Sequence, residues 1–490
     1  MINFVKTKKL TMGNSRLSSI ATLTGALSAL VPMAAAVEAE ASTRSDKQKD
    51  IILILTDQQT ASAMSCVGNP YVETPAMDAL ARDGVLLERA YCSFPLSGPS
   101  RAALLTGCMP QQVGAYDNGV RPDESYMERG FGHRLSDAGY ECLYAGKWHI
   151  PEVNIPEEGT GFKRVCVMDD RILAESCDRA LAERDKDKPL LLVASLLNPH
   201  EICEFARAQS LHYGELEPFE TEDCPNLPPN FMPSTYEAEA IRLEERMAPR
   251  SHDVFNYTED DWRRYLYGYY RLVERVDREI GRLIEVLKKR GIYDDAVIIF
   301  SSDHGDGVAA HQWNQKWTLF EEVINVPLII KSPKGEGLQG VVNSKALSNI
   351  GLDIYSTLCD YAGIELDSET YYGSSLRPLA EGRSEELHEE VFVETLLSSV
   401  ATRGWAIVEG RYKYVLYQHY QNREMLYDLA KDSGEMVNLA VDKRYREELT
   451  RLRKKMYEWS LKVGDKRLSR ELKWLTENPD KSTGHVRGNR

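Results

Sequence analysis

The feature that most constrains the fold is a series of short, continuous apolar runs separated by segments with helical periodicity. The runs cover residues 50–56, 190–197, 296–300 and 327–331. Runs of this kind, without polar alternation, are typical of parallel strands that are buried on both faces. Between 266 and 287, apolar residues recur every three or four positions, which predicts a long helix. The pattern therefore predicts an α/β fold with a mostly parallel central sheet flanked by helices.

The pattern changes after about residue 375. Short strand-like segments at 390–395, 405–408 and 412–417 are separated by Gly and polar residues, and 445–461 has helical periodicity. We predict a small antiparallel sheet with a terminal helix, and a loosely ordered polar end from about residue 466. The predicted domains are a catalytic α/β domain at 47–375 and a C-terminal subdomain at 376–490.

The first 41 residues have the pattern of a signal peptide. Basic residues precede a mostly small and apolar segment at 17–33, and alanine-rich sites for cleavage follow. The alternative is an N-terminal membrane anchor, but Ser, Thr and Gly interrupt the apolar segment and favour cleavage. We therefore expect a periplasmic or secreted protein with no membrane attachment after cleavage.

Charge and cysteine content narrow the function classes. The formal net charge is −15 at pH 7, which argues against a nucleic-acid partner. An anionic substrate would need a local basic pocket, because the net field opposes its approach. The nine cysteines are odd in number and contain no CxxC pair. We expect mostly buried free thiols, at most one or two disulfides, and no zinc site.

Two of the apolar runs are followed by an aspartate and a second polar residue. Asp57-Gln58 follows the first run and Asp303-His304 follows the third. Parallel sheets bind ligands at the carboxyl ends of their strands, and converging oxygen donors suit a hard cation such as calcium. Each cluster alone is better explained by helix capping, in which Asp is common. Their matching positions favour a metal site.

A third cluster contains Ser97, Pro99 and Arg101 at a predicted loop-to-helix junction. A hydroxyl, a guanidinium and backbone N–H groups at a helix N-terminus form an anion site. The alternative is a serine N-cap beside an exposed arginine, and the cluster alone does not decide between the two.

Three further segments carry candidate polar residues. Lys147 and His149 are two positions apart, so on a strand they would face the same side. His200 follows the second apolar run, and Lys316 follows the Asp303 cluster. A lone histidine is more often structural, and a lone lysine is usually a solvated surface charge.

Taken together and in this order, these clusters resemble the formylglycine-dependent (type I) sulfatases of the alkaline-phosphatase-like superfamily. The resemblance spans about residues 50–440, and its most specific part is Ser97-x-Pro-x-Arg101 followed by Leu105-Thr106-Gly107. It implies an enzyme that hydrolyses sulfate esters. It also implies that a maturase oxidises Ser97 to formylglycine, whose hydrated aldehyde attacks sulfur and forms a covalent sulfoenzyme.

The resemblance also implies a role for each of the other residues. Asp57, Gln58, Asp303 and His304 would hold Ca²⁺ together with residue 97. Arg101 and Lys147 would hold the diol and the sulfate, and Lys316 would reach a sulfate oxygen. His200 would be the general acid for the leaving alcohol, and His149 the base that allows sulfate release.

Two positions depart from the pattern of many relatives. The precursor is Ser97 where many relatives have cysteine, so maturation should need an oxygen-independent, iron–sulfur type of maturase, as in an anaerobic or facultative bacterium. Cys92 is not the precursor, because it lacks Pro and Arg at the required offsets. Gln58 stands where many relatives have a second aspartate, which removes one negative charge from the metal shell and would weaken calcium binding.

For the substrate we expect a sulfated saccharide, with glycosaminoglycan fragments first. Six residues near the motifs are candidate sugar contacts: Asn118, Arg121, Glu201, His311, Gln312 and Arg403. For Arg121 and Arg403 the alternative is an exposed surface arginine. Two other functions stay open: a phosphate or phosphonate ester hydrolase of the same superfamily, and a non-catalytic binder of sulfated glycans in which Ser97 stays unconverted.

Overall fold

The central sheet has eight strands in the order β4-β3-β5-β1-β6-β7-β2-β8. The computed structural model describes residues 48–150, 159–248, 254 and 256–478, so the predicted signal peptide at 1–41 lies outside the described residues. Only β7 is antiparallel to its neighbours β6 and β2. The strands are β1 (Ile51–Asp57), β2 (Val85–Tyr91), β3 (Glu141–Gly146), β4 (Lys163–Cys166), β5 (Leu190–Pro199), β6 (Val297–Ser302), β7 (Leu328–Lys331) and β8 (Val341–Asn349). The mostly parallel sheet is confirmed.

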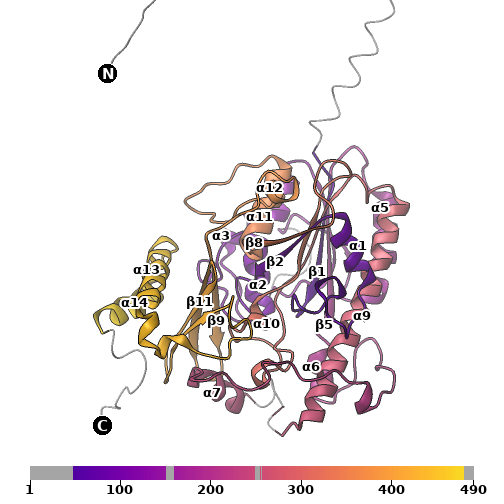
Figure 1. The fold of residues 1–490 in the computed structure, drawn as a ribbon. Coiled ribbons are helices and arrows are strands. Elements are labelled where there is room, and N and C mark those ends of the chain that lie inside the picture. Colours follow the sequence, from indigo (N-terminus) through magenta and orange to yellow (C-terminus); the bar gives the residue numbers. More distant parts are fainter. Residues whose placement is uncertain (1–47, 151–158, 249–253, 255, 479–490) are drawn as a thin grey trace, which may run out of the picture. The chain divides into compact units, whose positions relative to one another are not determined.

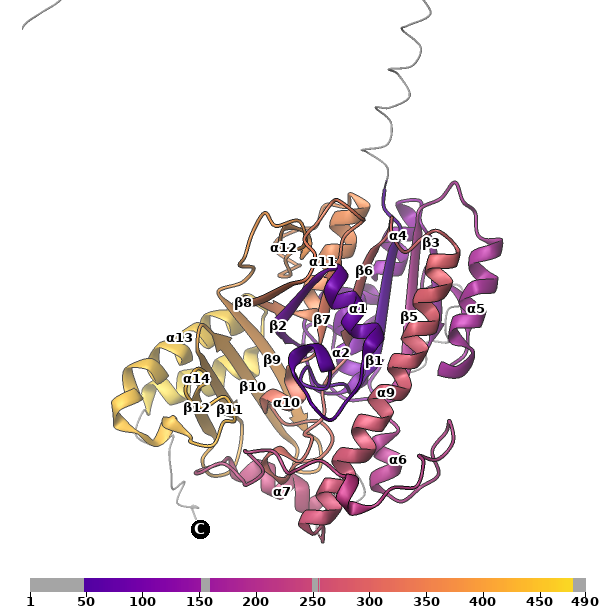
Figure 2. The same cartoon turned by 45° about the vertical axis from the view of Figure 1, so that its right-hand side comes forward.

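Helices cover both faces of this sheet (Figures 1 and 2). Alternate side chains of β1 enter different cores: Ile52 and Ile54 join one, and Leu53 and Leu55 the other. One face packs against α1 (Pro75–Asp83), α5 (Asp170–Glu183), α6 (Ile202–Ala206) and α9 (Glu259–Lys289). The other packs against α2 (Ser97–Thr106), α4 (Phe131–Asp137) and α11 (Ile350–Ala362). The remaining short helices are α3 (Glu124–Met127), α7 (Glu239–Met247), α10 (Glu321–Ile324) and α12 (Arg377–Ala380).

The predicted long helix is α9. It begins with a capping box, in which Thr258 and Asp261 each accept a hydrogen bond from the other's backbone N–H. Its apolar face, including Leu266, Val273 and Ile280, is fully buried against the sheet. The helix ends at Lys289, where basic residues suit the negative end of the helix dipole.

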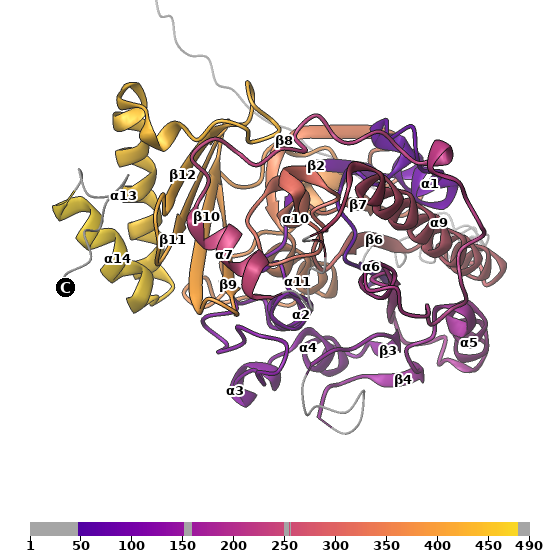
Figure 3. The ribbon, with the colours of Figure 1, turned by 90° about the horizontal axis from the view of Figure 1, so that it is seen from below.

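The second sheet is antiparallel, with the order β12-β11-β10-β9. Its strands are β9 (Glu390–Leu397), β10 (Thr402–Glu409), β11 (Tyr412–Tyr417) and β12 (Glu424–Asp428). Helix α13 (Arg446–Lys462) and helix α14 (Lys466–Glu477) lie on one side of it (Figure 3). The antiparallel sheet and a terminal helix are thus confirmed, and the domain boundary at residue 375 stays a prediction.

The expectation of a loosely ordered end from residue 466 is wrong for the described part of that segment. Asp465 caps α14 by accepting hydrogen bonds from the backbone N–H groups of Arg467 and Leu468. Leu468, Leu472 and Leu475 are buried at helical spacing against the second sheet's core. Burial of these three leucines stabilises α14 as a helix although most of its residues are polar.

All nine cysteines lie in the described part of the chain and all are free thiols, so the one or two disulfides that we allowed do not form. Eight are buried and Cys66 is half-buried. Within the same described residues, no helix combines the length and the apolarity of a membrane span.

Candidate active site

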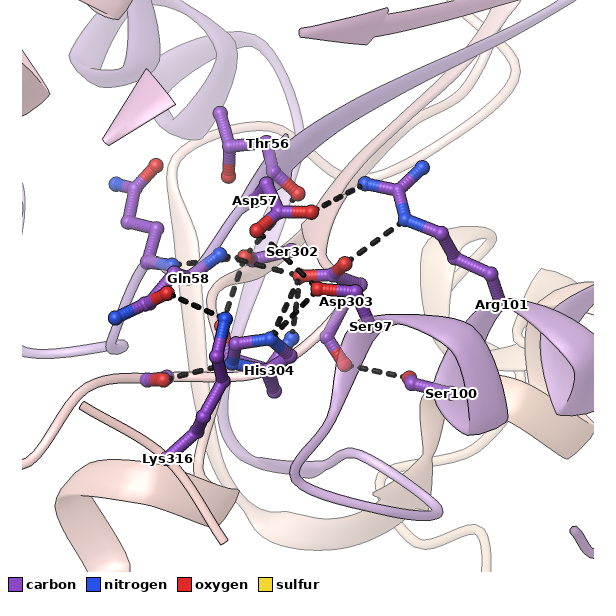
Figure 4. A network of polar contacts seen from close by, with 12 residues as sticks. Thr56, Asp57, Gln58, Ser97, Ser100, Arg101, Ser302, Asp303, His304 and Lys316 are labelled. Carbon is purple, nitrogen blue, oxygen red and sulfur yellow. Dashed lines mark hydrogen bonds and ion pairs between the residues drawn. The ribbon is translucent and has the colours of Figure 1, made fainter. Parts of the chain in front are cut away.

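The two predicted clusters, Asp57-Gln58 and Asp303-His304, meet at the carboxyl ends of β1 and β6, which are neighbours in the central sheet (Figure 4). Thr56 pairs with Ser302 in the register of these strands, so Asp57 and Asp303, each one residue further on, lie side by side. The parallel register thus brings together two residues that are far apart in the sequence.

Asp57, Asp303 and His304 offer ligand atoms that all lie within 4.8 Å of one another, and all three side chains are buried. Burial and the charge of Asp57 raise the pKa of Asp303 to about 7. Burial alone would raise the pKa of Asp57 as well, but the charges of Lys147 and Arg101 hold it well below its ordinary value. Two adjacent buried carboxylates favour a cation between them, so this donor set fits a divalent metal ion.

His304 presents a neutral ring nitrogen to this cluster. Burial and the charge of Lys316 lower its pKa to about 3, so the imidazole is neutral at pH 7. Its Nδ1 lies 2.8 Å from the carbonyl oxygen of Gly305 and donates to it, which leaves the lone pair on Nε2. Nε2 is 3.0 Å from the Ser97 hydroxyl, so it faces the site.

Ser97 is the first residue of α2, as the loop-to-helix junction predicted. Its Oγ lies 3.3 Å from Asp57 Oδ1 and is fully buried. The next backbone N–H, of Gly98, donates to the side-chain oxygen of Asn118 over 2.9 Å, so Asn118 fixes the start of this helix beside the hydroxyl. The helix N-terminus adds a partial positive charge at Ser97.

Arg101, one turn further along α2, donates hydrogen bonds to residues at the ends of three strands. Its Nε donates to Asp303 over 2.9 Å and its Nη2 to Asp57 over 3.0 Å. The third nitrogen, Nη1, donates to the Ser195 hydroxyl over 2.8 Å and to the Lys147 carbonyl over 3.1 Å. The two carboxylates raise the pKa of Arg101 against the effect of burial, so the guanidinium stays charged.

Lys147 and His149 lie just after β3 rather than on a strand, so the strand geometry that would turn both to one side does not apply. Strand β3 ends at Gly146, whose φ of +92° turns the chain; a Cβ there would lie 2.0 Å from the Ser195 carbonyl oxygen. Lys147 Nζ forms an ion pair of 2.8 Å with Asp57. Burial and Lys147 lower the pKa of His149 to about 3, so its imidazole is neutral and can accept a proton.

His200 follows β5 directly. Burial, Lys147 and Lys316 hold its pKa well below the ordinary value, so it too is neutral in this charge environment. Lys316 is 4 % exposed, and its Nζ donates to the side-chain oxygen of Gln58 over 2.9 Å. Three buried cations, Arg101, Lys147 and Lys316, therefore offer the local positive charge that an anionic substrate requires.

The six candidate sugar contacts differ in burial and in their partners. Glu201 is fully buried, and its carboxylate accepts hydrogen bonds from Asn198, Tyr213 and Arg275, which gives it a structural role. Arg121 is exposed and lies 3.7 Å from Glu124. Arg403 stacks on the ring of Tyr116. Gln312 is half-buried, with its amide near Met232. Among the described residues, Asn118 is the candidate that contacts the start of α2.

His311, the sixth candidate, is fully buried and stacks face to face on Phe320. Its ring lies near Glu322 and Glu435, and the ligand atoms of the three are within 4.8 Å of one another. Lys413 Nζ is 2.6 Å from Glu435, however, and supplies the positive charge that this acidic group requires. We therefore place His311 in the core between the site loop and the second sheet rather than at the substrate.

Sequence reasoning missed two buried residues that hold the site. Asp306 accepts hydrogen bonds from Gln58 and from Tyr265 on α9. Ser195 binds Arg101 from inside β5. The signals were present: Asp306 belongs to the same short motif as Asp303, and Ser195 is a hydroxyl within a run of Leu, Val and Ala.

Comparisons with known proteins agree with this geometry. The sulfatase family model matches residues 49–364, and the model of the N-sulphoglucosamine sulphohydrolase C-terminal region matches 309–462. The chain is 28 % identical over 439 residues to a Delta 4,5-hexuronate-2-O-sulfatase of Bacteroides thetaiotaomicron, covering 83 % of this chain and 87 % of the relative. It is 26 % identical to human N-sulphoglucosamine sulphohydrolase, covering 86 % and 91 %.

Solved structures give the same result for the fold. A 2-O GAG sulfatase superposes with a TM-score of 0.74 at 27 % identity, covering 86 % of this chain and 94 % of the other. A phosphonate monoester hydrolase of Agrobacterium radiobacter reaches 0.71 at 24 % identity, covering 85 % and 96 %, which shows the shared fold alone. The family match over more than half of the sequence, on a site with this arrangement, shows that the chain belongs to the sulfatase family, the type I sulfatases of the alkaline-phosphatase-like superfamily, and is a sulfuric ester hydrolase.

Proposed function

We propose that the enzyme removes sulfate from carbohydrates, with glycosaminoglycan-derived saccharides as the leading substrates, and that it uses formylglycine at residue 97 and a calcium ion. One observation carries this proposal: three buried cations, Arg101, Lys147 and Lys316, surround a buried acidic pair at a hydroxyl on a helix N-terminus. Sugar substrates are supported by relatives named as a hexuronate-2-O-sulfatase and an N-acetylglucosamine-6-O-sulfatase.

In this proposal the acidic residues of the site hold the metal ion and the basic residues neutralise the sulfate. Formylglycine at 97, when present, supplies a hydrated aldehyde whose hydroxyl attacks sulfur. Asp57, Asp303 and His304 would hold the metal ion, with Gln58 completing the set. Arg101 and Lys147 lie beside the carboxylates that would hold the metal, where they can offset negative charge on the sulfate.

The two site histidines need different protonation states for their proposed roles. His149 is neutral, as a base must be, and would take a proton during sulfate release. His200 is neutral in the free enzyme because of burial and of Lys147 and Lys316. A bound sulfate adds negative charge that offsets these two lysines and raises the pKa of His200, so we propose that it becomes the acid for the leaving alcohol on substrate binding.

Maturation and location belong to the same proposal. Ser97 is the precursor at the position of the nucleophile, so we propose that an oxygen-independent, iron–sulfur maturase converts it. We also propose that residues 1–41 direct the chain to the periplasm or outside the cell, where sulfated polysaccharides are degraded.

The experiment that tests substrate class is sulfate release from sulfated mono- and disaccharides, with phosphate and phosphonate esters as controls. The protein is matured in its native host, or prepared as Ser97→Cys with an oxygen-dependent maturase, and conversion is checked by mass spectrometry. Sulfate release from one saccharide would support the proposal and define the position of attack. Faster turnover of the phosphonate esters would overturn it in favour of the alternative hydrolase. Saccharide binding without turnover, by protein from the native host whose Ser97 is found unconverted, would favour the binding function.

A further inference from the structure

The side-chain amide of Gln58 is held from both ends. Its Nε2 donates to Asp306 over 2.8 Å, and its Oε1 accepts from Lys316 Nζ over 2.9 Å. The residue is fully buried and its φ of +69° lies in the left-handed region, so the backbone is also fixed in an uncommon conformation. The backbone N–H of Gln58 donates to Asp303 over 3.1 Å, so the backbone of Gln58 lies beside the metal cluster.

Asp306 determines which end of this amide faces the cluster. An ionised carboxylate only accepts hydrogen bonds, and the other partners of Asp306 are donors too. They are the Tyr265 hydroxyl at 2.8 and 2.9 Å and the backbone N–H groups of Val308 and Gln315 at 2.8 and 3.1 Å. The Gln58 nitrogen must therefore point to Asp306, and the oxygen must point away from it, toward Lys316.

A carboxylate at position 58 would not fit this surrounding. Its oxygen would face Asp306, also fully buried, with no hydrogen between them, and two buried like charges at contact distance repel strongly. Glutamine at 58 and aspartate at 306 are therefore matched to each other. Position 58 carries no negative charge, but the carboxylate of Asp306, which is hydrogen-bonded to the Gln58 amide, supplies one behind it.

We propose that Asp306 is a positioning residue that turns the Gln58 amide oxygen toward the metal ion, and that the Gln58–Asp306 pair takes the place of a second ligating aspartate. This inference rests on the proposed metal site. A purely structural role for Asp306, in which it only ties α9 to the loop after β6 through Tyr265, would stabilise the fold without affecting metal affinity.

The test is a set of four variants, measured by calcium titration calorimetry and by thermal unfolding in chelator. Changes to groups that support metal ligands typically cost 10–100-fold in metal affinity, so we expect Asp306→Asn to weaken calcium binding by at least ~10-fold. Gln58→Asp should lower the unfolding temperature in chelator, because it creates the repelling pair. The double variant Gln58→Asp with Asp306→Asn should regain the calcium affinity lost in Asp306→Asn and the unfolding temperature lost in Gln58→Asp, since the asparagine amide can donate to the new carboxylate. Tyr265→Phe is the matched control, and we expect it to lower stability while calcium affinity stays within about 3-fold.

The outcomes separate the inference from the proposed function. If the unchanged protein binds no calcium, the proposed metal site fails and the inference fails with it. If the unchanged protein binds calcium and Asp306→Asn binds it equally well, or the double variant binds no better than Asp306→Asn, only the inference is overturned. If Asp306→Asn does not fold, Gln58→Met is measured in its place. This variant removes the amide's hydrogen bonds to Asp306, Lys316 and Cys203 at similar volume, and undiminished calcium affinity would overturn the inference.

Discussion

The substitution Arg101→Gln should destabilise the metal-free protein strongly. Arg101 is 2 % exposed and its guanidinium forms ion pairs with both Asp57 and Asp303. Removing one partner of a buried ion pair typically costs ~3–5 kcal/mol, because it leaves an uncompensated buried charge. Here two carboxylates lose that partner, and among the described lysines and arginines Lys147 alone remains paired with one of them, Asp57. At roughly 2 °C per kcal/mol for a large domain, the unfolding temperature should fall by about 5–10 °C.

The assay is thermal unfolding in chelator and in excess calcium, followed by circular dichroism. Calcium supplies a cation at the same carboxylates, so the loss should be smaller in calcium than in chelator. Arg171→Gln is the matched control: Arg171 is exposed and pairs with Asp169 at the surface, where such pairs contribute ~1 kcal/mol or less. An Arg101→Gln protein that unfolds within about 1 °C of the unchanged protein in chelator would refute the reasoning, since ~3–5 kcal/mol cannot be lost without a larger shift.

Three further predictions concern other residues. Burial and Asp465 raise the pKa of Glu394 to about 8, so its contribution to stability is full below the ordinary glutamate pKa and is lost as pH rises through about 8. Between pH 5 and pH 9 the variant Glu394→Gln should therefore gain stability relative to the unchanged protein, by an amount on the order of 1–3 kcal/mol in denaturant titrations. An equal stability difference at both pH values would contradict this prediction. Gly146→Ala should lower both stability and kcat, because its Cβ would lie 2.0 Å from the Ser195 carbonyl oxygen next to Lys147; wild-type kcat would show that this approach does not matter. His200→Ala should slow hydrolysis of alkyl sulfates by roughly 100-fold or more while activated aryl sulfates lose less, and equal losses for both substrate types would refute the acid role.

The strands and the long helix were predictable because their apolar patterns are unbroken. The run at 50–56 became β1 and the helical period at 266–287 became the buried face of α9. Helix α14 was not predicted, since its three buried leucines are set among charged residues and their burial depends on the second sheet. The antiparallel direction of β7 could not be read from its sequence, because an apolar run has no direction.

At the site, the sequence indicated which residues converge but not how each is held. Parallel strand ends predicted the meeting of Asp57 and Asp303, and the register confirms it. The turn at Gly146 was not predicted, because a positive φ at the end of a strand depends on the close approach of β5. Glu201 was misjudged since its partner Arg275 lies on α9, 74 residues away in the chain.

The measurement that tests the central claim most directly is sulfate release by the matured enzyme beside Ser97→Ala, with residue 97 analysed by mass spectrometry in both. The account predicts that the matured protein carries formylglycine at 97 and releases sulfate from a sulfated saccharide. It also predicts that chelator suppresses this release and that Ser97→Ala abolishes it. Sulfate release by Ser97→Ala at the rate of the matured enzyme would contradict the account, because the nucleophile would then lie elsewhere.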